Sequence, residues 1–262
     1  MKSLHLFLFL AALLSIFTGC SKRDPNILKI GMELTYPPFE MTDAEDDPDG
    51  ISVRMAEALG QSLGRPIEIV NVGWDGIIAA LRTGKIDLII SSMTKTEERE
   101  KSIAFSDPYV TNSLCTLVGK ESTIATPEDL KRTGIRIAVK GETTGESYVS
   151  ENLPKAEMIR LDQASDCVLQ VMQGKADAFV YDQITIYSSW KAHPAETRAI
   201  LTPIRAESWA IGLRQGENAL RDQVNAFLKE FRAKKGFEAL TERYMAEEKK
   251  AFQEQGIPFI FD

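Results

Sequence analysis

The sequence predicts an α/β protein built from two Rossmann-like lobes. Short β-branched apolar segments alternate with segments whose apolar residues recur at helical spacing, which is typical of strand–helix–strand units around a parallel sheet. This alternation occurs twice along the chain, in two stretches offset by 90 residues. We therefore expect one lobe from each stretch. The chain has 262 residues, which is long enough for two such lobes.

The first stretch contains three expected strands and two expected helices. The strands are at 27–31, 67–72 and 87–90. Apolar residues three and four apart over 53–63 indicate a helix between the first two strands. A second apolar stripe over 77–81 indicates a helix before the third strand, and Asp75 is its expected N-cap.

The alternation of strands and helices resumes in the second stretch. Thr126 and Pro127, followed by two acidic residues, predict the start of a helix. Strands are expected at 135–139 and 176–181, with a helix near 164–173 between them. Two amphipathic, charge-rich helices are expected at 217–232 and 237–248.

The two stretches align without a gap, residues 67–92 over residues 157–182. Shared α/β patterning and internal duplication both explain the similarity. In each stretch a helix ends at a Gly-Lys pair, a strand follows, and polar residues stand at its carboxyl end, Ser91-Ser92 in one and Tyr181-Asp182 in the other. Ligands of open α/β sheets bind at such strand ends, so two facing lobes predict a ligand cleft between them.

Composition excludes several classes of protein. The net charge of −7 argues against a nucleic-acid partner, because nucleic-acid binders present basic faces. Three cysteines do not suit a small disulfide scaffold or a zinc ribbon, and Cys115 and Cys167 lie in apolar stretches where burial is expected. The two histidines, His5 and His193, belong to no metal-binding or catalytic motif. We expect no catalytic residues, no metal and no cofactor.

The N-terminus has the features of an export signal. Lys2 precedes an apolar run over 4–17, which is too short to span a bilayer comfortably. Small residues before Cys20 resemble the bacterial lipobox, with Phe17 at the position of the usual leucine. The prediction is a signal peptide at 1–19, then a lipidated Cys20 and a linker to residue 26, with the exported protein anchored to a membrane in the periplasm or at the cell surface. A plain signal peptide or an uncleaved anchor is the alternative.

The predicted cleft contains groups for both ends of an α-amino acid. Ser91, Ser92 and Thr94 place three hydroxyls on one loop, and Arg99 follows at the start of a helix. Hydroxyls, an arginine and the free N–H groups of a helix start bind carboxylates. Residues 142–146 are expected to form such a start in the second lobe. Asp182 adds a fixed negative charge for an ammonium group.

Four segments resemble the polar amino-acid-binding proteins of bacterial ABC importers. They are GMELTYPPFE at 31–40, WDG at 74–76, GKIDLIISSMTKTEER at 84–99 and FSDPY at 105–109. These importer components are type II periplasmic binding proteins, or family 3 extracellular solute-binding proteins, and the resemblance covers 27–248. It implies two lobes, 27–112 with 208–262 and 113–207. Two crossing strands, near 110–116 and 203–209, would act as a hinge that closes on the ligand.

The resemblance also implies a set of ligand contacts. Carried over to this chain, the contacts are Glu33, Tyr36, Trp74, Ser91, Ser92, Thr94, Arg99, Lys140, Thr143, Thr144 and Asp182. Arg99 would bind the ligand's carboxylate and Asp182 its ammonium group. Where the family often has Gly-Thr-Thr, this chain has Glu142 before the two threonines.

The function implied is capture of a free polar L-amino acid and its delivery to an ABC permease in the inner membrane, by a protein expected to be a monomer. An enzyme on the same fold, such as a cyclohexadienyl dehydratase, and a ligand sensor for a receptor are the alternatives. A Glu33–Lys140 pair across the cleft would suit an uncharged side chain such as that of glutamine, whereas Glu33 over Trp74 would suit arginine or lysine. The sequence leaves these two specificities open.

Overall fold

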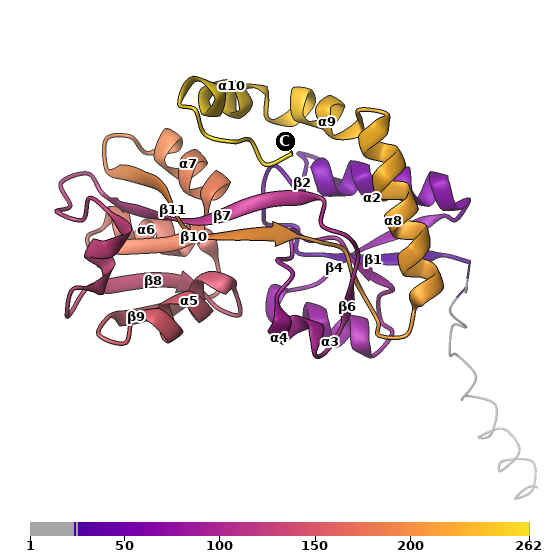
Figure 1. Ribbon diagram of the computed structural model, residues 1–262, viewed down its shortest axis with the longest axis horizontal. Helices are drawn as coiled ribbons and strands as arrows, with labels where there is room; N and C mark the ends of the chain where they lie inside the picture. The colour runs from indigo at the N-terminus through magenta and orange to yellow at the C-terminus, as the bar shows by residue number, and fades with distance from the viewer. Residues whose placement is uncertain (1–23, 25, 262) are drawn as a thin grey trace, which may run out of the picture.

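The computed structural model describes residues 24 and 26–261 and contains two separate five-stranded sheets joined by long strands. Figure 1 shows the two sheets side by side, each covered by helices. We call the part built on the first sheet lobe 1 and the part built on the second sheet lobe 2. The predicted signal peptide at 1–19 and the predicted lipidation site Cys20 lie outside the described residues.

The sheet of lobe 1 has the strand order β4-β1-β5-β12-β6. Its strands are β1 (Leu28–Met32), β4 (Ile67–Asn71), β5 (Leu88–Ile89), β6 (Ala104–Phe105) and β12 (Gly212–Leu213). Strand β1 is parallel to β4 and β5, whereas β12 is antiparallel to β5 and β6. The helical segments among them are α2 (Ile51–Leu63), η2 (Trp74–Gly76), α3 (Ile77–Arg82) and α4 (Glu97–Glu100), and β2 (Met41–Thr42) pairs with β3 (Pro48–Asp49).

The sheet of lobe 2 has the order β11-β7-β10-β8-β9. Its strands are β7 (Val110–Gly119), β8 (Arg136–Lys140), β9 (Glu157–Leu161), β10 (Ala178–Asp182) and β11 (Thr197–Trp209). The helical segments are η3 (Pro127–Lys131), α5 (Thr144–Asn152), α6 (Ala164–Met172) and α7 (Gln183–Ala192). Strands β9, β8 and β10 are parallel, and β7 pairs antiparallel with both β10 and β11.

The long strands β7 and β11 connect the two lobes as an antiparallel pair (Figure 1). The chain enters lobe 2 along β7 and returns to lobe 1 along β11. They correspond to the two crossing strands implied by the resemblance. The prediction of parallel strands is therefore correct for β4, β1 and β5 in lobe 1 and for β9, β8 and β10 in lobe 2. It is wrong for β6 and β12, and for the crossing strands, which pair antiparallel because the chain crosses along one and returns along the other. The predicted lobe boundaries fall within this paired region and remain a prediction.

Two local predictions are wrong, and a third is confirmed in a shorter form. Asp75 lies inside η2 rather than capping α3, which is preceded by Gly76 and has no side-chain cap. The helix predicted to start at Thr126 is present as the short 3₁₀ helix η3, with Thr126 as its N-cap and its capping box formed. The helix expected at 237–248 is divided at Met245 into α9 (Gly236–Tyr244) and α10 (Ala246–Glu254), which follow α8 (Asn218–Ala233). Met245 has a non-helical backbone and a buried side chain, so packing overrides helix propensity there.

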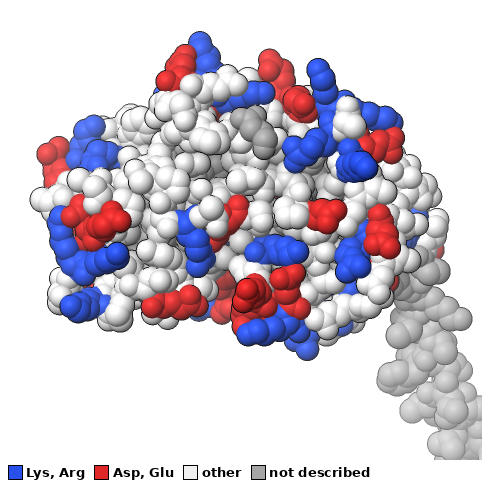
Figure 2. Space-filling view, in the orientation of Figure 1, with Lys and Arg blue, Asp and Glu red and all other residues white. Residues whose placement is uncertain are grey.

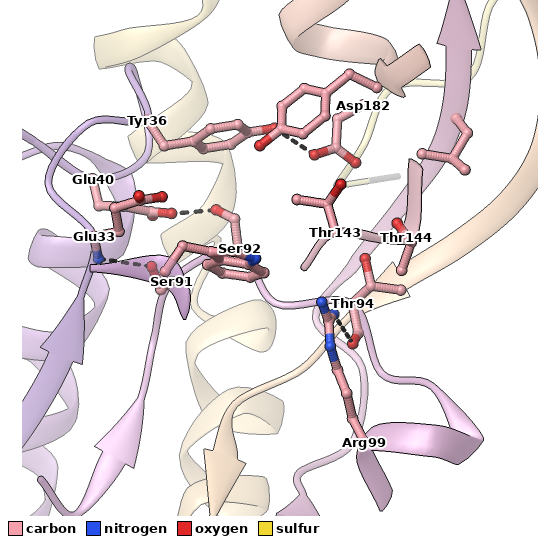
Figure 3. Close-up of a pocket in the computed structure, with 13 residues that line it drawn as sticks. Glu33, Tyr36, Glu40, Ser91, Ser92, Thr94, Arg99, Thr143, Thr144 and Asp182 are labelled. Carbon is pink, nitrogen blue, oxygen red and sulfur yellow. Dashed lines mark hydrogen bonds between the residues drawn. The ribbon is translucent and has the colours of Figure 1, made fainter. Parts of the chain in front are cut away.

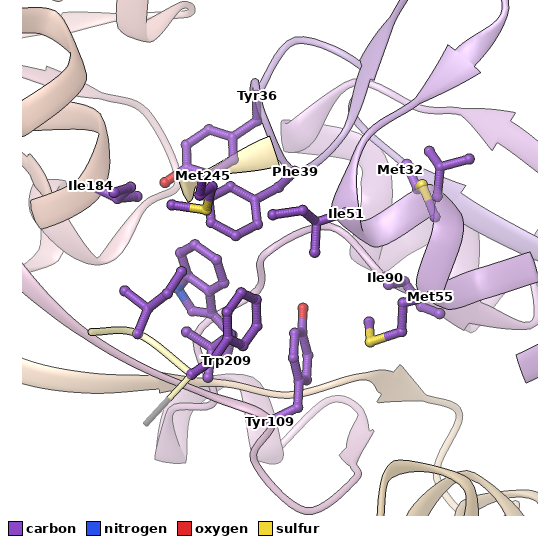
Figure 4. Close-up of a cluster of buried hydrophobic side chains, with 14 of the residues drawn as sticks. Met32, Tyr36, Phe39, Ile51, Met55, Ile90, Tyr109, Ile184, Trp209 and Met245 are labelled. Carbon is purple, nitrogen blue, oxygen red and sulfur yellow. The ribbon is translucent and has the colours of Figure 1, made fainter. Parts of the chain in front are cut away.

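A cluster of aromatic and aliphatic side chains includes Trp209 at the end of β11 (Figure 4). The ring centroids of Phe39 and Trp209 are 4.9 Å apart, and those of Tyr36 and Trp209 are 6.0 Å apart, both in edge-to-face geometry. Ile184 from α7 and Met245 belong to the same cluster. The core that supports the cleft therefore includes side chains from both lobes.

Cys115 and Cys167 are free and buried, as expected, and burial raises the pKa of each thiol to about 12. Among the residues that the structure describes, no helix has the length and apolarity needed to cross a membrane. On the face shown in Figure 2, basic and acidic side chains are interspersed.

Candidate ligand-binding site

A pocket lies between the two lobes, at the ends of strands from both sheets (Figure 3). Its walls are formed by Glu33, Tyr36, Glu40, Trp74, Ser91, Ser92, Thr94, Arg99, Leu114, Thr143, Thr144, Tyr181 and Asp182. The structure thus brings together the residues predicted from the sequence; Lys140 is not one of the lining residues, but its ammonium contacts the lining residue Glu33. The position of the pocket follows from the strand ends, as the α/β pattern predicts.

The hydroxyl loop after β5 is fastened to its neighbours. The backbone N–H of Glu33 donates to Ser91 Oγ at 2.9 Å, which ties the end of β1 to this loop. Ser92 has a φ of 48°, in the left-handed region, and its hydroxyl donates to Glu40 Oε2 at 3.2 Å. A non-glycine residue in this conformation is strained, and such residues cluster at binding loops.

Glu40 is a pocket residue that the sequence analysis did not assign. Its side chain is buried, and burial raises the pKa of this carboxyl to about 8, against the opposing hydrogen bonds of Ser52 and Ser92. The only sequence signal was its place at the end of the segment 31–40. Nothing in that segment shows that its last residue turns inward.

Arg99 provides a partly buried positive charge at one end of the pocket. Its Nη1 donates to the carbonyl of Thr94 at 2.7 Å and its Nη2 to the carbonyl of Glu142 at 3.1 Å, and the guanidinium lies 5.3 Å from the centroid of Trp74. Burial lowers the pKa of Arg99. Within the described part of the chain, no carboxylate forms an ion pair with it. A partly buried guanidinium that contacts only carbonyls and an aromatic ring is suited to an incoming anion.

Asp182 provides the opposite charge on lobe 2. It accepts hydrogen bonds from Tyr36 Oη at 2.9 Å and from the Asn112 side-chain amide. Burial, together with the nearby charge of Glu207, raises the pKa of Asp182 to about 7. No cation among residues 24 and 26–261 forms an ion pair with it. The charge of Arg99 favours the ionised form of Asp182, but burial outweighs it, so the carboxylate lacks a cation in direct contact.

Glu33 and Lys140 form an ion pair across the cleft. Only 9% of the Glu33 side chain and 4% of the Lys140 side chain are exposed. The Lys140 ammonium also lies 5.8 Å from the centroid of Trp74. The pairing considered from the sequence is thus present in the structure, and it balances the charges at this end of the pocket.

The loop before α5 closes the rim of the pocket. Glu142 has a φ of 59°, a conformation that favours glycine, and its N–H donates to Glu146 Oε2 at 2.6 Å. Its carbonyl accepts from Trp74 Nε1 at 3.0 Å as well as from Arg99. Thr143 caps α5 by accepting from the N–H of Glu146. The glutamate in place of the usual glycine therefore keeps the backbone shape, and it makes contacts to lobe 1.

Within the described chain, no group of three or more His, Cys, Asp or Glu side chains could hold a metal ion. The chemistry available at the site is that of an arginine, two balanced charges, an aspartate, hydroxyls and aromatic rings.

The family model of the bacterial extracellular solute-binding proteins, family 3, matches residues 28–247 of this sequence. The chain belongs to this family.

Three relatives illustrate the membership of this family 3 protein. It is 28% identical to ABC transporter arginine-binding protein 1 of Escherichia coli strain K12, with 90% of this chain and 98% of the relative covered. An ancestral arginine-binding protein, solved with bound glutamine, has a TM-score of 0.78 and 30% identity and covers 86% of this chain and 100% of its own. An ancestral amino acid-binding protein, a precursor of cyclohexadienyl dehydratase, has a TM-score of 0.76 and 33% identity, covering 84% and 95%. The fold is that of the type II periplasmic binding proteins.

Proposed function

We propose that the protein captures a free polar L-amino acid between its lobes and delivers it to an ABC permease. The observation that carries the proposal is the pair of opposite charges in one pocket, the partly buried Arg99 on lobe 1 and the buried Asp182 on lobe 2. Neither is balanced by an ion pair in the described chain. An α-amino acid carries a carboxylate and an ammonium group a few ångströms apart, so one zwitterion would balance both.

The side-chain end of the pocket supports an uncharged polar ligand such as glutamine. Glu33 and Lys140 balance each other there, so a cationic side chain would be repelled by Lys140 and an anionic one by Glu33. An amide can donate to Glu33 and accept from Lys140 without adding charge. The structure of the ancestral relative with bound glutamine supports this choice.

A basic amino acid is the second candidate. The Lys140 ammonium lies beside Glu33 and over the ring of Trp74, which is the place a ligand's cationic side chain would take if Lys140 turned away. The name of the Escherichia coli relative, an arginine-binding protein, favours this candidate.

We propose binding without chemistry. The relatives named above are binding proteins by name. Turnover of prephenate or arogenate would contradict this proposal.

We also propose export and attachment to a membrane through Cys20, because the features of residues 1–20 are those of a lipoprotein signal. Metabolic labelling with a fatty acid, lost in a Cys20→Ser variant, would test the attachment.

A thermal-shift screen of the twenty amino acids, followed by calorimetric titration of those that raise Tm, tests the proposal. A bound ligand stabilises the folded protein by mass action, so glutamine is expected to give the largest shift. Small-angle scattering should show a more compact protein at saturation, since the hinge closes on the ligand. Absence of any shift with all twenty amino acids would contradict amino-acid capture, and an unchanged radius at saturation would contradict closure.

A further inference from the structure

A buried glutamate on the crossing strand β11 accepts a hydrogen bond from one threonine hydroxyl of each lobe. Glu207 lies on β11, and only 3% of its side chain is exposed. Its Oε2 accepts a hydrogen bond from Thr94 Oγ1 of lobe 1 at 3.0 Å and one from Thr144 Oγ1 of lobe 2 at 2.8 Å. One carboxylate oxygen therefore links the two walls of the pocket.

The other oxygen of Glu207 is held by Arg205. Oε1 accepts from Arg205 Nε at 3.0 Å and from Arg205 Nη2 at 2.8 Å, and the same Nη2 donates to the carbonyl of Thr144 at 3.1 Å. Arg205 thus balances the charge of Glu207 and orients it. Arg99 lies close enough for the charge of Glu207 to act on it, yet its own donors go to backbone carbonyls.

A threonine hydroxyl has a single hydrogen to donate. Thr94 and Thr144 cannot donate to Glu207 and to a second carboxylate at the same time. Thr94 and Thr144 line the pocket together with Arg99, at the end where the proposed function puts the carboxylate of the amino acid. The carboxylate of Glu207 and the carboxylate of a ligand are therefore competitors for the same two hydrogens.

We propose that Glu207 is an internal substitute for the ligand's carboxylate, which bridges the lobes through Thr94 and Thr144 until an amino acid displaces it. This inference rests on the proposed function for the identity of the competitor. It makes Glu207 a residue that limits affinity for every ligand with a free α-carboxylate, whatever the side chain. It also makes Glu207 a residue that holds the protein compact without ligand.

The binding test uses Glu207→Gln, which keeps the size of the side chain and removes its charge. Wild type and variant are titrated with L-glutamine, L-arginine, L-lysine and L-histidine, and with the α-carboxamides of the same amino acids. We expect the variant to bind the amino acids about tenfold more tightly, because neutral acceptors hold hydroxyl hydrogens less strongly than carboxylates do. The carboxamides should gain less than twofold. Glu196→Gln, the same change at an exposed residue just before β11, should leave all affinities unchanged.

Equal or weaker binding of the amino acids by Glu207→Gln, or an equal gain for the carboxamides, overturns the inference. The bridging role is measured on the protein alone, by comparing the radius of gyration of wild type, Glu207→Ala and Glu196→Ala, with thermal melting to verify folding. A larger radius in Glu207→Ala only is expected, and an unchanged radius overturns the bridge. If wild type binds none of the amino acids, the proposed function fails, and the radius still decides whether Glu207 joins the lobes.

Discussion

The two ends of the pocket differ in whether their charged side chains form an ion pair. At the side-chain end, Glu33 and Lys140 neutralise each other across the cleft. At the other end, Arg99 and Asp182 contact carbonyls, a hydroxyl and an amide, and neither has an ion-pair partner in the described residues. Burying an unbalanced charge is unfavourable, so a protein retains it where a ligand supplies the missing charge.

We expect the two ends to have different roles: one binds the groups common to all amino acids, and the other selects among their side chains. The unbalanced charges match what all α-amino acids share, and they should control whether any amino acid binds. The balanced pair matches what differs among amino acids, and it should control which one binds. Changes at the two ends are therefore expected to have different signatures: uniform loss at one end and altered ranking at the other.

The largest effect is expected from Arg99→Ala. Removing a buried charged partner costs about 2–5 kcal/mol, so every amino acid should bind at least about 30-fold more weakly. Isothermal titration of the variant against glutamine, arginine and lysine measures this loss. Arg82→Ala removes an exposed arginine from the same lobe and serves as the control. Affinity within a few-fold of wild type would show that Arg99 does not contact the ligand. Loss of affinity for one ligand only would contradict the separate roles of the two ends.

Much of the fold follows from local patterns in the sequence. The central parallel strands of both lobes, with α2, α3 and α6, lie within a few residues of their predicted positions because each has its own apolar periodicity. The antiparallel pairing of β7 with β11 and the break at Met245 depend on contacts between distant segments. No local pattern carries that information.

The same distinction applies to the site. Ser91, Ser92 and Asp182 follow strands, and a residue at the end of a strand can be recognised from the strand itself. Glu207 is different: its partners Thr94 and Thr144 are 113 and 63 residues away along the chain. Glu40 is likewise identified by its burial and by its contact with Ser92, 52 residues away along the chain. Charged residues whose role depends on packing between lobes were therefore missed.

An intermediate effect is expected from Lys140→Met. The substitution leaves Glu33 as an unbalanced charge, so the side-chain end should come to resemble the other end and accept a cation. Because a hydrogen bond to a charged group contributes about 1.5–3 kcal/mol, the ratio of the Kd values of lysine and glutamine should shift towards lysine by about tenfold or more. Competition titrations with both amino acids measure the ratio.

Two variants serve as controls for Lys140→Met. Lys175→Met removes an exposed lysine from lobe 2 and should leave the ratio unchanged. The double variant Glu33→Gln with Lys140→Met removes both charges and should lose the preference for lysine. It also guards against unfolding, because an unpaired buried glutamate destabilises the single variant by about 3–5 kcal/mol. An unchanged ranking in Lys140→Met would show that the pair does not select the side chain.

The smallest expected effect is a dependence of affinity on pH, and it isolates Asp182. Burial raises the pKa of this carboxyl from 3.8 to about 7, so the protein alone loses stability from this group as the pH rises from about 4 through 7. A ligand ammonium group requires the ionised form, so binding takes a proton off Asp182 and strengthens as pH rises. With a pKa of about 7, Kd should be about fourfold higher at pH 6.5 than at pH 8.

Asp182→Asn provides the control for this pH dependence. It should bind all amino acids more weakly by a similar factor and lose the dependence on pH. Any dependence that persists belongs to Glu40, whose pKa of about 8 gives it the same sign. Titrations of both proteins at pH 6.5 and 8 separate the two carboxyls, because only one is removed. If wild type and Asp182→Asn show the same slope, Asp182 is not the group that meets the ammonium, and the unbalanced end of the pocket contains only the arginine.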